Sequence, residues 1–190
     1  KRQSYESFLD VGWQKKIERP LLDLNFFEET IESNIFFDLN AGTIYNLNSK
    51  QLELIDADTG QLIKVFELET DRIISGVSVG YNSFFYVDTD GIVYAHDANS
   101  GVLKWTKELE DIVLSKILIT STQVFLQTSS DILYGMDLQT GETKWQKQAQ
   151  APLLSIRGTA SPIIYEGLIF TSFSNGRLAA VRAVDGIQLW

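Results

Sequence analysis

The sequence predicts an all-β protein, a β-propeller of four-stranded antiparallel blades of which this chain holds about four. One observation is a repeat in which four glycines recur 41, 40 and 45 residues apart: Gly60, Gly101, Gly141 and Gly186. Another is a tryptophan four residues after three of these glycines and an aspartate four residues before three of them: Trp105, Trp145, Trp190, Asp56, Asp97 and Asp137. The third is composition, since 11 Phe, 7 Tyr and 4 Trp accompany only 3 Pro. A repeat of about 40–45 residues is typical of propeller blades.

The N-terminal region is predicted to contribute a single strand, the one that closes a blade. Val11–Lys16 resembles residues 144–148, so Trp13 stands where a blade has its last strand, and we expect a latch strand at about 11–18. Only 12 residues precede Trp13, so the other strands of that sheet must come from elsewhere. In propellers the N-terminal strand often completes the last blade. We therefore expect residues 1–190 to form one partial propeller domain, the N-terminal half of a larger ring.

Four blades are expected, because short runs of alternating apolar and polar residues, separated by turn residues, favour half-buried antiparallel strands. The blades are predicted at about residues 35–68, 74–109, 113–148 and 160–190. The strands of the first two are predicted at Ile35–Phe37, Thr43–Leu47, Gln51–Ile55 and Gln61–Leu68, then Gly76–Val79, Phe84–Val87, Ile92–His96 and Val102–Leu109. Those of the last two are predicted at Ile117–Thr120, Val124–Thr128, Ile132–Asp137 and Glu142–Lys147, then Pro162–Tyr165, Leu168–Ser172, Arg177–Arg182 and from Ile187 onward. The first blade diverges most, with Lys64 at the tryptophan position.

One motif repeats in full. Ala95-x-Asp97-x-x-Ser100-Gly101-x-x-x-Trp105 returns as Gly135-x-Asp137-x-x-Thr140-Gly141-x-x-x-Trp145. It resembles the tryptophan-docking motif of quinoprotein (PQQ-like) propeller repeats. The glycine should supply a turn with positive φ, the Asp and Ser or Thr should bond the turn backbone, and the indole should pack on the neighbouring blade. We expect a structural role rather than a quinone site for this set: Trp105, Trp145, Trp190, Gly101, Gly141, Gly186, Asp97 and Asp137.

No catalytic, cofactor or metal site is expected. The chain has no cysteine, which excludes disulfides and thiolate chemistry, and no P-loop, G-x-G-x-x-G or catalytic triad. Asp56, Asp97 and Asp137 fall in different blades and should lie far apart, while His96 is the only histidine. A formal charge of −9 argues against a nucleic-acid groove. No run approaches the ~18 apolar residues of a membrane span, and no signal peptide is expected at the N-terminus.

The connector between the third and fourth blades is longer than its counterpart. Trp105 to Lys116 is 11 residues, whereas Trp145 to Ser161 is 16, so five extra residues lie within 146–160. This stretch carries Leu153, Leu154, Ile156 and Arg157. Exposed apolar residues beside an arginine are typical of a protein-binding hot spot. Alternatively, these side chains fold back onto the blade edge; physical reasoning on the sequence leaves both interpretations open.

The same connector carries a narrower resemblance. Leu154–Pro162, followed by Ser174–Val181, resembles the BamB family of outer-membrane assembly lipoproteins, with its L-S-L-R-G-x-S/A-x-P stretch. The resemblance implies an eight-bladed, non-enzymatic scaffold without a cofactor, held by a lipid at the periplasmic face of the outer membrane in a Gram-negative bacterium. It also implies that the connector binds the periplasmic domains of BamA through four residues: Leu154, Ser155, Ile156 and Arg157. The lipidated cysteine is absent here, as are later blades with further acidic contact residues.

Two other functions compete with a BamA-binding scaffold that also guides unfolded outer-membrane proteins. One is a PQQ-dependent quinoprotein dehydrogenase; that family usually shows adjacent cysteines and acidic calcium ligands, and this chain has no cysteine. The other is a general interaction module with a different protein partner. Binding of PQQ and calcium would support the dehydrogenase. Binding of BamA that Arg157→Ala leaves intact would support the general interaction module.

Overall fold

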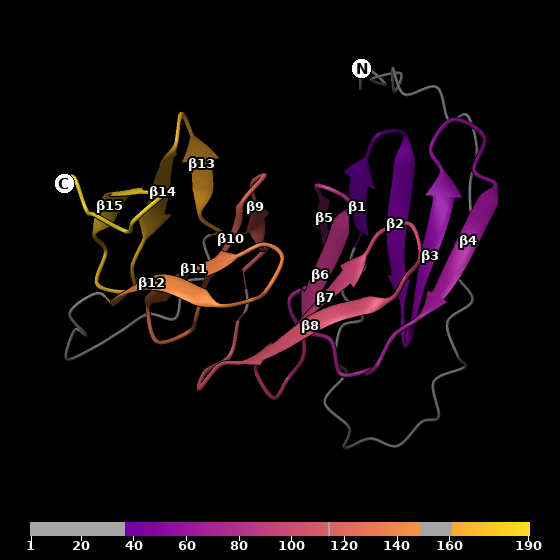
Figure 1. Ribbon diagram of the computed structural model, residues 1–190, viewed down its shortest axis with the longest axis horizontal. Helices are drawn as coiled ribbons and strands as arrows, with labels where there is room; N and C mark the ends of the chain where they lie inside the picture. The colour runs from indigo at the N-terminus through magenta and orange to yellow at the C-terminus, as the bar shows by residue number, and fades with distance from the viewer. Residues whose placement is uncertain (1–36, 114, 149–160) are drawn as a thin grey trace, which may run out of the picture.

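Glycine turns and β-forming runs divide the chain into separate antiparallel sheets. The computed structural model describes residues 37–113, 115–148 and 161–190. These residues form four sheets, which lie side by side in chain order from indigo to yellow (Figure 1). The predicted latch strand at about 11–18, with Trp13, lies outside the described residues. So does the stretch with Leu154, Ser155, Ile156 and Arg157.

Each sheet follows the order of its strands along the chain. The first contains β1 (Phe37–Asn40), β2 (Thr43–Asn48), β3 (Gln51–Asp56) and β4 (Leu62–Glu67), and the second β5 (Ser78–Gly80), β6 (Ser83–Val87), β7 (Ile92–Asp97) and β8 (Leu103–Glu108). The third contains β9 (Leu118–Ile119), β10 (Gln123–Gln127), β11 (Ile132–Asp137) and β12 (Thr143–Gln148), and the fourth β13 (Ile163–Tyr165), β14 (Leu168–Ser172) and β15 (Leu178–Arg182). In the fourth sheet, the predicted last strand is represented by a single antiparallel bridge between Val181 and Gln188. We call the four sheets blades 1 to 4.

The first two strands of three blades are joined by two-residue turns whose backbone has positive φ at both positions. These turns are Ala41-Gly42, Tyr81-Asn82 and Glu166-Gly167. Two positive φ angles match the type I′ turn, whose twist suits a right-handed hairpin. The turns set the register in which Gly80 pairs with Ser83, and Tyr165 with Leu168.

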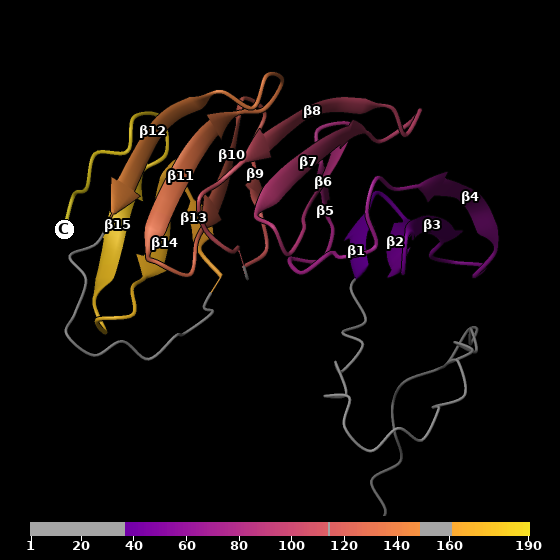
Figure 2. The same ribbon diagram turned by 90° about the horizontal axis from the view of Figure 1, so that it is seen from below.

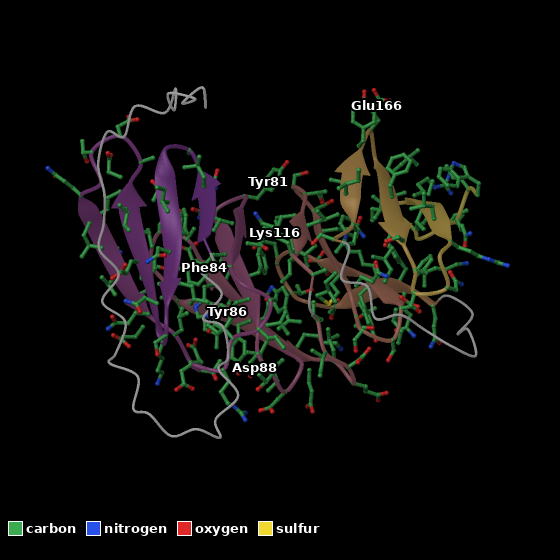
Figure 3. All side chains as sticks on the ribbon, turned by 180° about the vertical axis from the view of Figure 1, so that it is seen from behind. Tyr81, Phe84, Tyr86, Asp88, Lys116 and Glu166 are labelled. Atoms are coloured by element: carbon green, nitrogen blue, oxygen red, sulfur yellow. The ribbon has the colours of Figure 1, made fainter. Side chains whose placement is uncertain are left out.

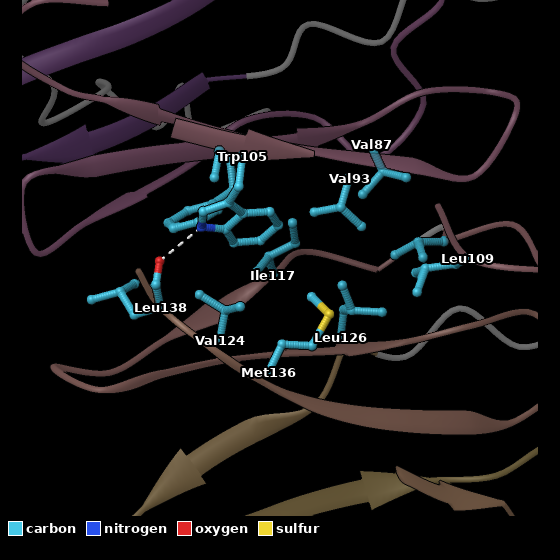
Figure 4. Close-up of a cluster of buried hydrophobic side chains, with 12 residues drawn as sticks. Val87, Val93, Trp105, Leu109, Ile117, Val124, Leu126, Met136 and Leu138 are labelled. Atoms are coloured by element: carbon cyan, nitrogen blue, oxygen red, sulfur yellow. Dashed lines mark hydrogen bonds between the residues drawn. The ribbon is translucent and has the colours of Figure 1, made fainter. Parts of the chain in front are cut away.

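The core lies between the blades rather than within any one of them. All five residues of β6 are buried, and so are all five of β10. Along β6 the side chains alternate, so Phe84 and Tyr86 pack with blade 1, while Phe85 and Val87 pack with blade 3. Figure 4 shows the cluster between blades 2 and 3. A blade therefore needs a neighbour on each face to bury its apolar side chains, as in other repeat architectures.

The first strands of successive blades also lie next to one another. β1 contacts β5, and β5 contacts β9. Seen at right angles to the first view, the blades stack as successive sheets with their outer strands β4, β8 and β12 away from these inner strands (Figure 2). Inner strands that meet and outer strands that diverge are the arrangement of propeller blades.

Candidate functional site

The tryptophan of blade 2 docks onto the last turn of blade 3. Trp105 is 8% exposed, and its indole Nε1 donates a hydrogen bond of 3.0 Å to the carbonyl oxygen of Leu138 (Figure 4). A Cβ atom added to Gly141 would lie 2.6 Å from the indole ring, so only a glycine fits there. The positive φ of Gly141, 72°, favours glycine as well.

Trp145 repeats this contact between blades 3 and 4. Its Nε1 donates to the carbonyl oxygen of Ala183 at 2.9 Å, and its ring lies 2.6 Å from a Cβ built on Gly186. On its other side the indole rests against Gly135, where a Cβ would come within 2.3 Å. Trp190, by contrast, is 60% exposed, and its ring lies 6.2 Å from that of Phe170. The structure thus brings each docked tryptophan together with a glycine of the following blade.

Blade 1 achieves the same docking with two residues instead of one. Lys64, at the tryptophan position, donates from Nζ to the carbonyl oxygen of Asn99 at 2.8 Å. Phe66, two residues later on the same face of β4, places its ring 2.3 Å from a Cβ built on Gly101. The Lys64 ammonium lies 4.8 Å from the centre of the Phe66 ring. Lys64 supplies the hydrogen-bond donor and Phe66 supplies the aromatic ring. A sequence pattern defined by a single tryptophan therefore misses Phe66.

The repeated aspartates cap the turns that receive these rings. Oδ1 of Asp97 accepts hydrogen bonds from the backbone amides of Asn99 and Ser100 and from the Ser100 hydroxyl. Asp137 accepts from the amides of Gln139 and Thr140, and Lys144 lies 2.9 Å from its other oxygen. The Ser100 hydrogen bonds lower the pKa of Asp97 to about 2, and the Lys144 hydrogen bond leads the causes that lower the pKa of Asp137 to about 2.

In the corresponding turn of blade 4, a basic residue stands at the position of the aspartate. Arg182 stands at the aspartate position and pairs with Asp185, with Nε 2.9 Å from Oδ1. The Arg182 hydrogen bond lowers the pKa of Asp185 below its usual range. The turn glycine keeps its positive φ of 72° at Gly186. The ion pair therefore replaces the carboxylate cap without changing the turn.

His96 lies in a buried contact between blades 1 and 2. It is fully buried and stacks on Phe84 with ring centres 4.7 Å apart. Its Nδ1 donates to the carbonyl oxygen of Gly101 at 3.0 Å, and its Nε2 lies 3.2 Å from the Tyr86 hydroxyl and from Glu69. These contacts fix the Gly101 turn on which Phe66 packs, so His96 has both stacking and hydrogen-bonding partners.

Figure 3 shows Phe84, Tyr86 and Asp88 following one another along and just beyond β6. Tyr94 donates to Asp88 at 3.1 Å, and burial, followed by this hydrogen bond, raises the pKa of Tyr94 to about 12. Burial likewise raises the pKa of Tyr86 far above its usual range. Both tyrosines act as hydrogen-bond donors, Tyr94 to Asp88 and Tyr86 to Glu69 at 2.9 Å.

The parts of the chain that the structure describes contain no group of three or more His, Asp and Glu side chains placed to hold a metal ion. The three repeated aspartates, Asp56, Asp97 and Asp137, cap separate turns in separate blades. No helix suited to crossing a membrane is found among residues 37–113, 115–148 and 161–190.

The predicted partner site belongs to the connector after blade 3, and the two described connectors show how such segments are normally held. After blade 1, the carbonyl oxygen of Arg72 accepts from the amide of Thr89 at 2.8 Å. After blade 2, the carbonyl oxygen of Ile112 accepts from the amide of Ser129 at 2.8 Å. Each connector is thus paired with the turn between the second and third strands of the blade that follows. These turns and connectors form one face of the protein, which is the candidate interaction face.

Blades packed through their strands and joined by aromatic side chains on glycine turns define a β-propeller of PQQ-like repeats. A family model described as Outer membrane protein assembly factor BamB matches residues 48–190, and the chain belongs to that family. A curated relative, Outer membrane protein assembly factor BamB from Yersinia pestis, is 28% identical over 149 residues, covering 73% of this chain and 38% of the relative. The match confirms the resemblance predicted from the Leu154–Pro162 stretch.

Solved structures share the fold. The crystal structure of BamB from Moraxella catarrhalis matches 81% of this chain and 47% of that protein, with a TM-score of 0.71 and 23% identity. The computationally designed Ika8 protein matches 76% of this chain and 44% of its own, with a TM-score of 0.61 and 10% identity. The predicted all-β propeller is confirmed. The chain spans less than half the length of each of these three proteins.

Proposed function

We propose that this chain serves as a non-enzymatic scaffold in the assembly of outer-membrane proteins. It works in the periplasm, at the inner face of the outer membrane, and binds the periplasmic domains of BamA. The family match over residues 48–190 is the observation that carries this proposal. The named relatives are assembly factors, and the repeated tryptophans and aspartates Trp105, Trp145, Asp97 and Asp137 have structural partners in the blades, which supports a scaffold over a quinoprotein enzyme.

The BamA contact is assigned to Leu154, Ser155, Ile156 and Arg157. Three connectors share a short pattern in the sequence: Ile73-Ile74-Ser75, Val113-Leu114-Ser115 and Leu153-Leu154-Ser155. In the first two, the serine is followed directly by Gly76 or Lys116, which lead into the inner strand. In the third, five residues beginning with Ile156 come before the corresponding Ser161. Ile156 and Arg157 belong to these extra residues, which have no counterpart in the first two connectors, and this fits a role that the other connectors do not perform. Leu154 and Ser155 are assigned to the contact by the family resemblance alone.

We assign the binding of unfolded outer-membrane proteins to a separate surface, the edges of the outer strands. β4, β8 and β12 are the last strands of their sheets, so each has an edge without a further strand among the described residues. Exposed Leu62 and Ile63 on β4, and Leu103 on β8, add apolar surface to these edges. An extended segment of a client could pair with such an edge by strand addition.

Site-specific photo-crosslinking tests both surfaces together. We expect a crosslinkable amino acid at Ile156 to capture purified BamA periplasmic domains, and one at exposed Thr106 on β8 to capture an unfolded client but not BamA. Each position serves as the control for the other. Capture of BamA from Thr106 alone would contradict the assigned site, and failure of Thr106 to capture any client would contradict the strand-addition role.

A further inference from the structure

We propose that Gln127 and Asp131 make blade 3 specific for one partner, blade 4 of the same chain. The two side chains thereby keep blades of similar sequence from pairing in the wrong order or between two copies of the protein. We call the side of a blade that meets the next blade in the chain its forward face, and the opposite side its backward face. The specificity lies on the forward face of blade 3 and is independent of the proposed function.

The forward faces of blades 2 and 3 are alike in their apolar side chains. On the forward face of blade 2, the ring centres of Phe85 and Trp105 lie 5.9 Å apart. On that of blade 3, the ring centres of Phe125 and Trp145 lie 5.8 Å apart. Apolar contacts have no direction, so such faces distinguish poorly between the correct neighbour and another blade. Incorrect assembly is a characteristic failure of repeat proteins, and a polar contact that identifies the neighbour opposes it.

One pair of side chains differs in character between the two junctions. The register of the sheets places Gln127 of blade 3 where blade 2 has Val87. It places Thr171 of blade 4 where blade 3 has Leu126. Between blades 2 and 3 the pair is apolar, since Val87 and Leu126 lie in one buried cluster (Figure 4). Between blades 3 and 4 the pair is polar, because the Thr171 hydroxyl donates a hydrogen bond to Oε1 of Gln127.

The amide of Gln127 uses both its oxygen and its nitrogen at this junction. Gln127 is 7% exposed, and its Nε2 donates to the carbonyl oxygen of Ser172 at 2.9 Å. The partner of its oxygen, Thr171, is 2% exposed. A buried amide that met a leucine instead would lose its partner and stay out of water, which is unfavourable. A backward face with an apolar residue at this place, such as Leu126 of blade 3, therefore does not match the forward face of blade 3.

Asp131 adds a second polar contact to the same junction. Its carboxylate is buried and accepts hydrogen bonds of 3.0 Å from the amide of Ser174 with both oxygens, and a further one from the Ser174 hydroxyl. Blades 2 and 4 have glycine in the corresponding turn, Gly91 and Gly176, with φ of 81° and 77°. Asp131 adopts a φ of 61°, which is unfavourable for a residue with a side chain. The unfavourable backbone occurs where the carboxylate reaches the next blade.

The backward faces of blades 2 and 3 do not offer Asp131 the amide that blade 4 offers. In blade 2 the corresponding amide, that of Thr89, donates to the carbonyl oxygen of Arg72 at 2.8 Å. In blade 3 the amide of Ser129 donates to the carbonyl oxygen of Ile112 at 2.8 Å. A carboxylate buried against either face would lack this partner, and an unpaired buried charge is strongly unfavourable. Gln127 and Asp131 thus fit blade 4 and disfavour the other two blades.

The test measures pairing between chains. Two copies of the full chain with different affinity tags are unfolded together in urea and refolded by dilution, and one copy is recovered by its tag. The second copy recovered with it, in excess of that found when separately refolded copies are mixed, reports blades that paired between chains. Gln127→Val, Asp131→Gly and Thr171→Leu together give this junction the residues of the junction between blades 2 and 3. We expect this triple variant to raise the excess on the order of tenfold, because the discrimination against the wrong blade is gone.

Two further variants keep the outcomes apart. Asp131→Gly alone matches Gly91 and should raise the excess by a smaller factor, so the test remains decisive if the triple variant does not refold. Gly42→Ala strains a turn of blade 1, where φ is 76° and none of the described residues lies within 4 Å of the added Cβ, and should leave the excess unchanged. No rise for the triple variant and Asp131→Gly would show that the apolar faces alone select the neighbour. An equal rise for Gly42→Ala would show that pairing between chains follows lower stability, and either result would overturn the proposal.

Discussion

Replacing Trp105 by alanine is expected to lower the free energy of unfolding by about 3–5 kcal/mol, the usual cost of truncating a large buried aromatic side chain. Trp105 is 8% exposed and belongs to the cluster that joins blades 2 and 3. The substitution also removes the donor to the Leu138 carbonyl oxygen. Because blades are stable only through their neighbours, the loss weakens the junction rather than one sheet. Urea unfolding followed by tryptophan fluorescence and circular dichroism measures it.

Trp190→Ala is the matched control. The same side chain is removed, but Trp190 is 60% exposed, so we expect a change within about 0.5 kcal/mol. Equal losses for Trp105→Ala and Trp190→Ala would contradict the docking role assigned to the buried indole.

Gly141→Ala is expected to be the second most damaging single change, lowering the free energy of unfolding by about 2–4 kcal/mol. One part of the cost is backbone strain, since the residue has a φ of 72°. The other part is overlap, since the new Cβ would lie 2.6 Å from the Trp105 ring. The indole would have to leave its place, which would also break its hydrogen bond to Leu138. Equilibrium unfolding again gives the value.

Gly176→Ala separates the two causes. Gly176 has a similar φ of 77°, but none of the residues that the structure describes lies within 4 Å of its added Cβ, so only the strain of about 1–2 kcal/mol should remain. In a double-mutant cycle, Gly141→Ala should cost less in the Trp105→Ala background, by about 1–3 kcal/mol, because the overlapping ring is gone. Strict additivity would show that the glycine and the indole do not interact.

The sequence was sufficient for the fold because the determinants of a propeller recur at a fixed spacing. Strands β11 and β14 have the bounds predicted for Ile132–Asp137 and Leu168–Ser172, and the others differ at one or both ends. The inner strands differ most, as in β5, which starts at Ser78 rather than Gly76. The pairing of the inner strands depends on contacts with the neighbouring blade. The alternation of apolar and polar residues along a strand does not reveal those contacts.

Features that depend on contacts between blades could not be predicted from the sequence. The replacement of one tryptophan by Lys64 and Phe66 becomes visible only when both meet the turn around Gly101. The hydrogen bonds of Gln127 with Ser172 and of Asp131 with Ser174 likewise join residues more than 40 positions apart, and no local pattern in the sequence indicates them. The partner residues Leu154, Ser155, Ile156 and Arg157 remain a prediction from the resemblance and the repeat length.

The central claim, that the connector after blade 3 binds BamA, is tested most directly by titrating BamA periplasmic domains with the unchanged chain, with Arg157→Ala and with Arg182→Ala. Arg182 is the exposed last residue of β15 and serves as the control. Loss of an arginine anchor should cost about 2 kcal/mol, or about 30-fold in Kd, for Arg157→Ala, whereas Arg182→Ala should bind BamA as the unchanged chain does. Equal affinity of all three proteins for BamA would contradict the assignment of Arg157 and the site built around it.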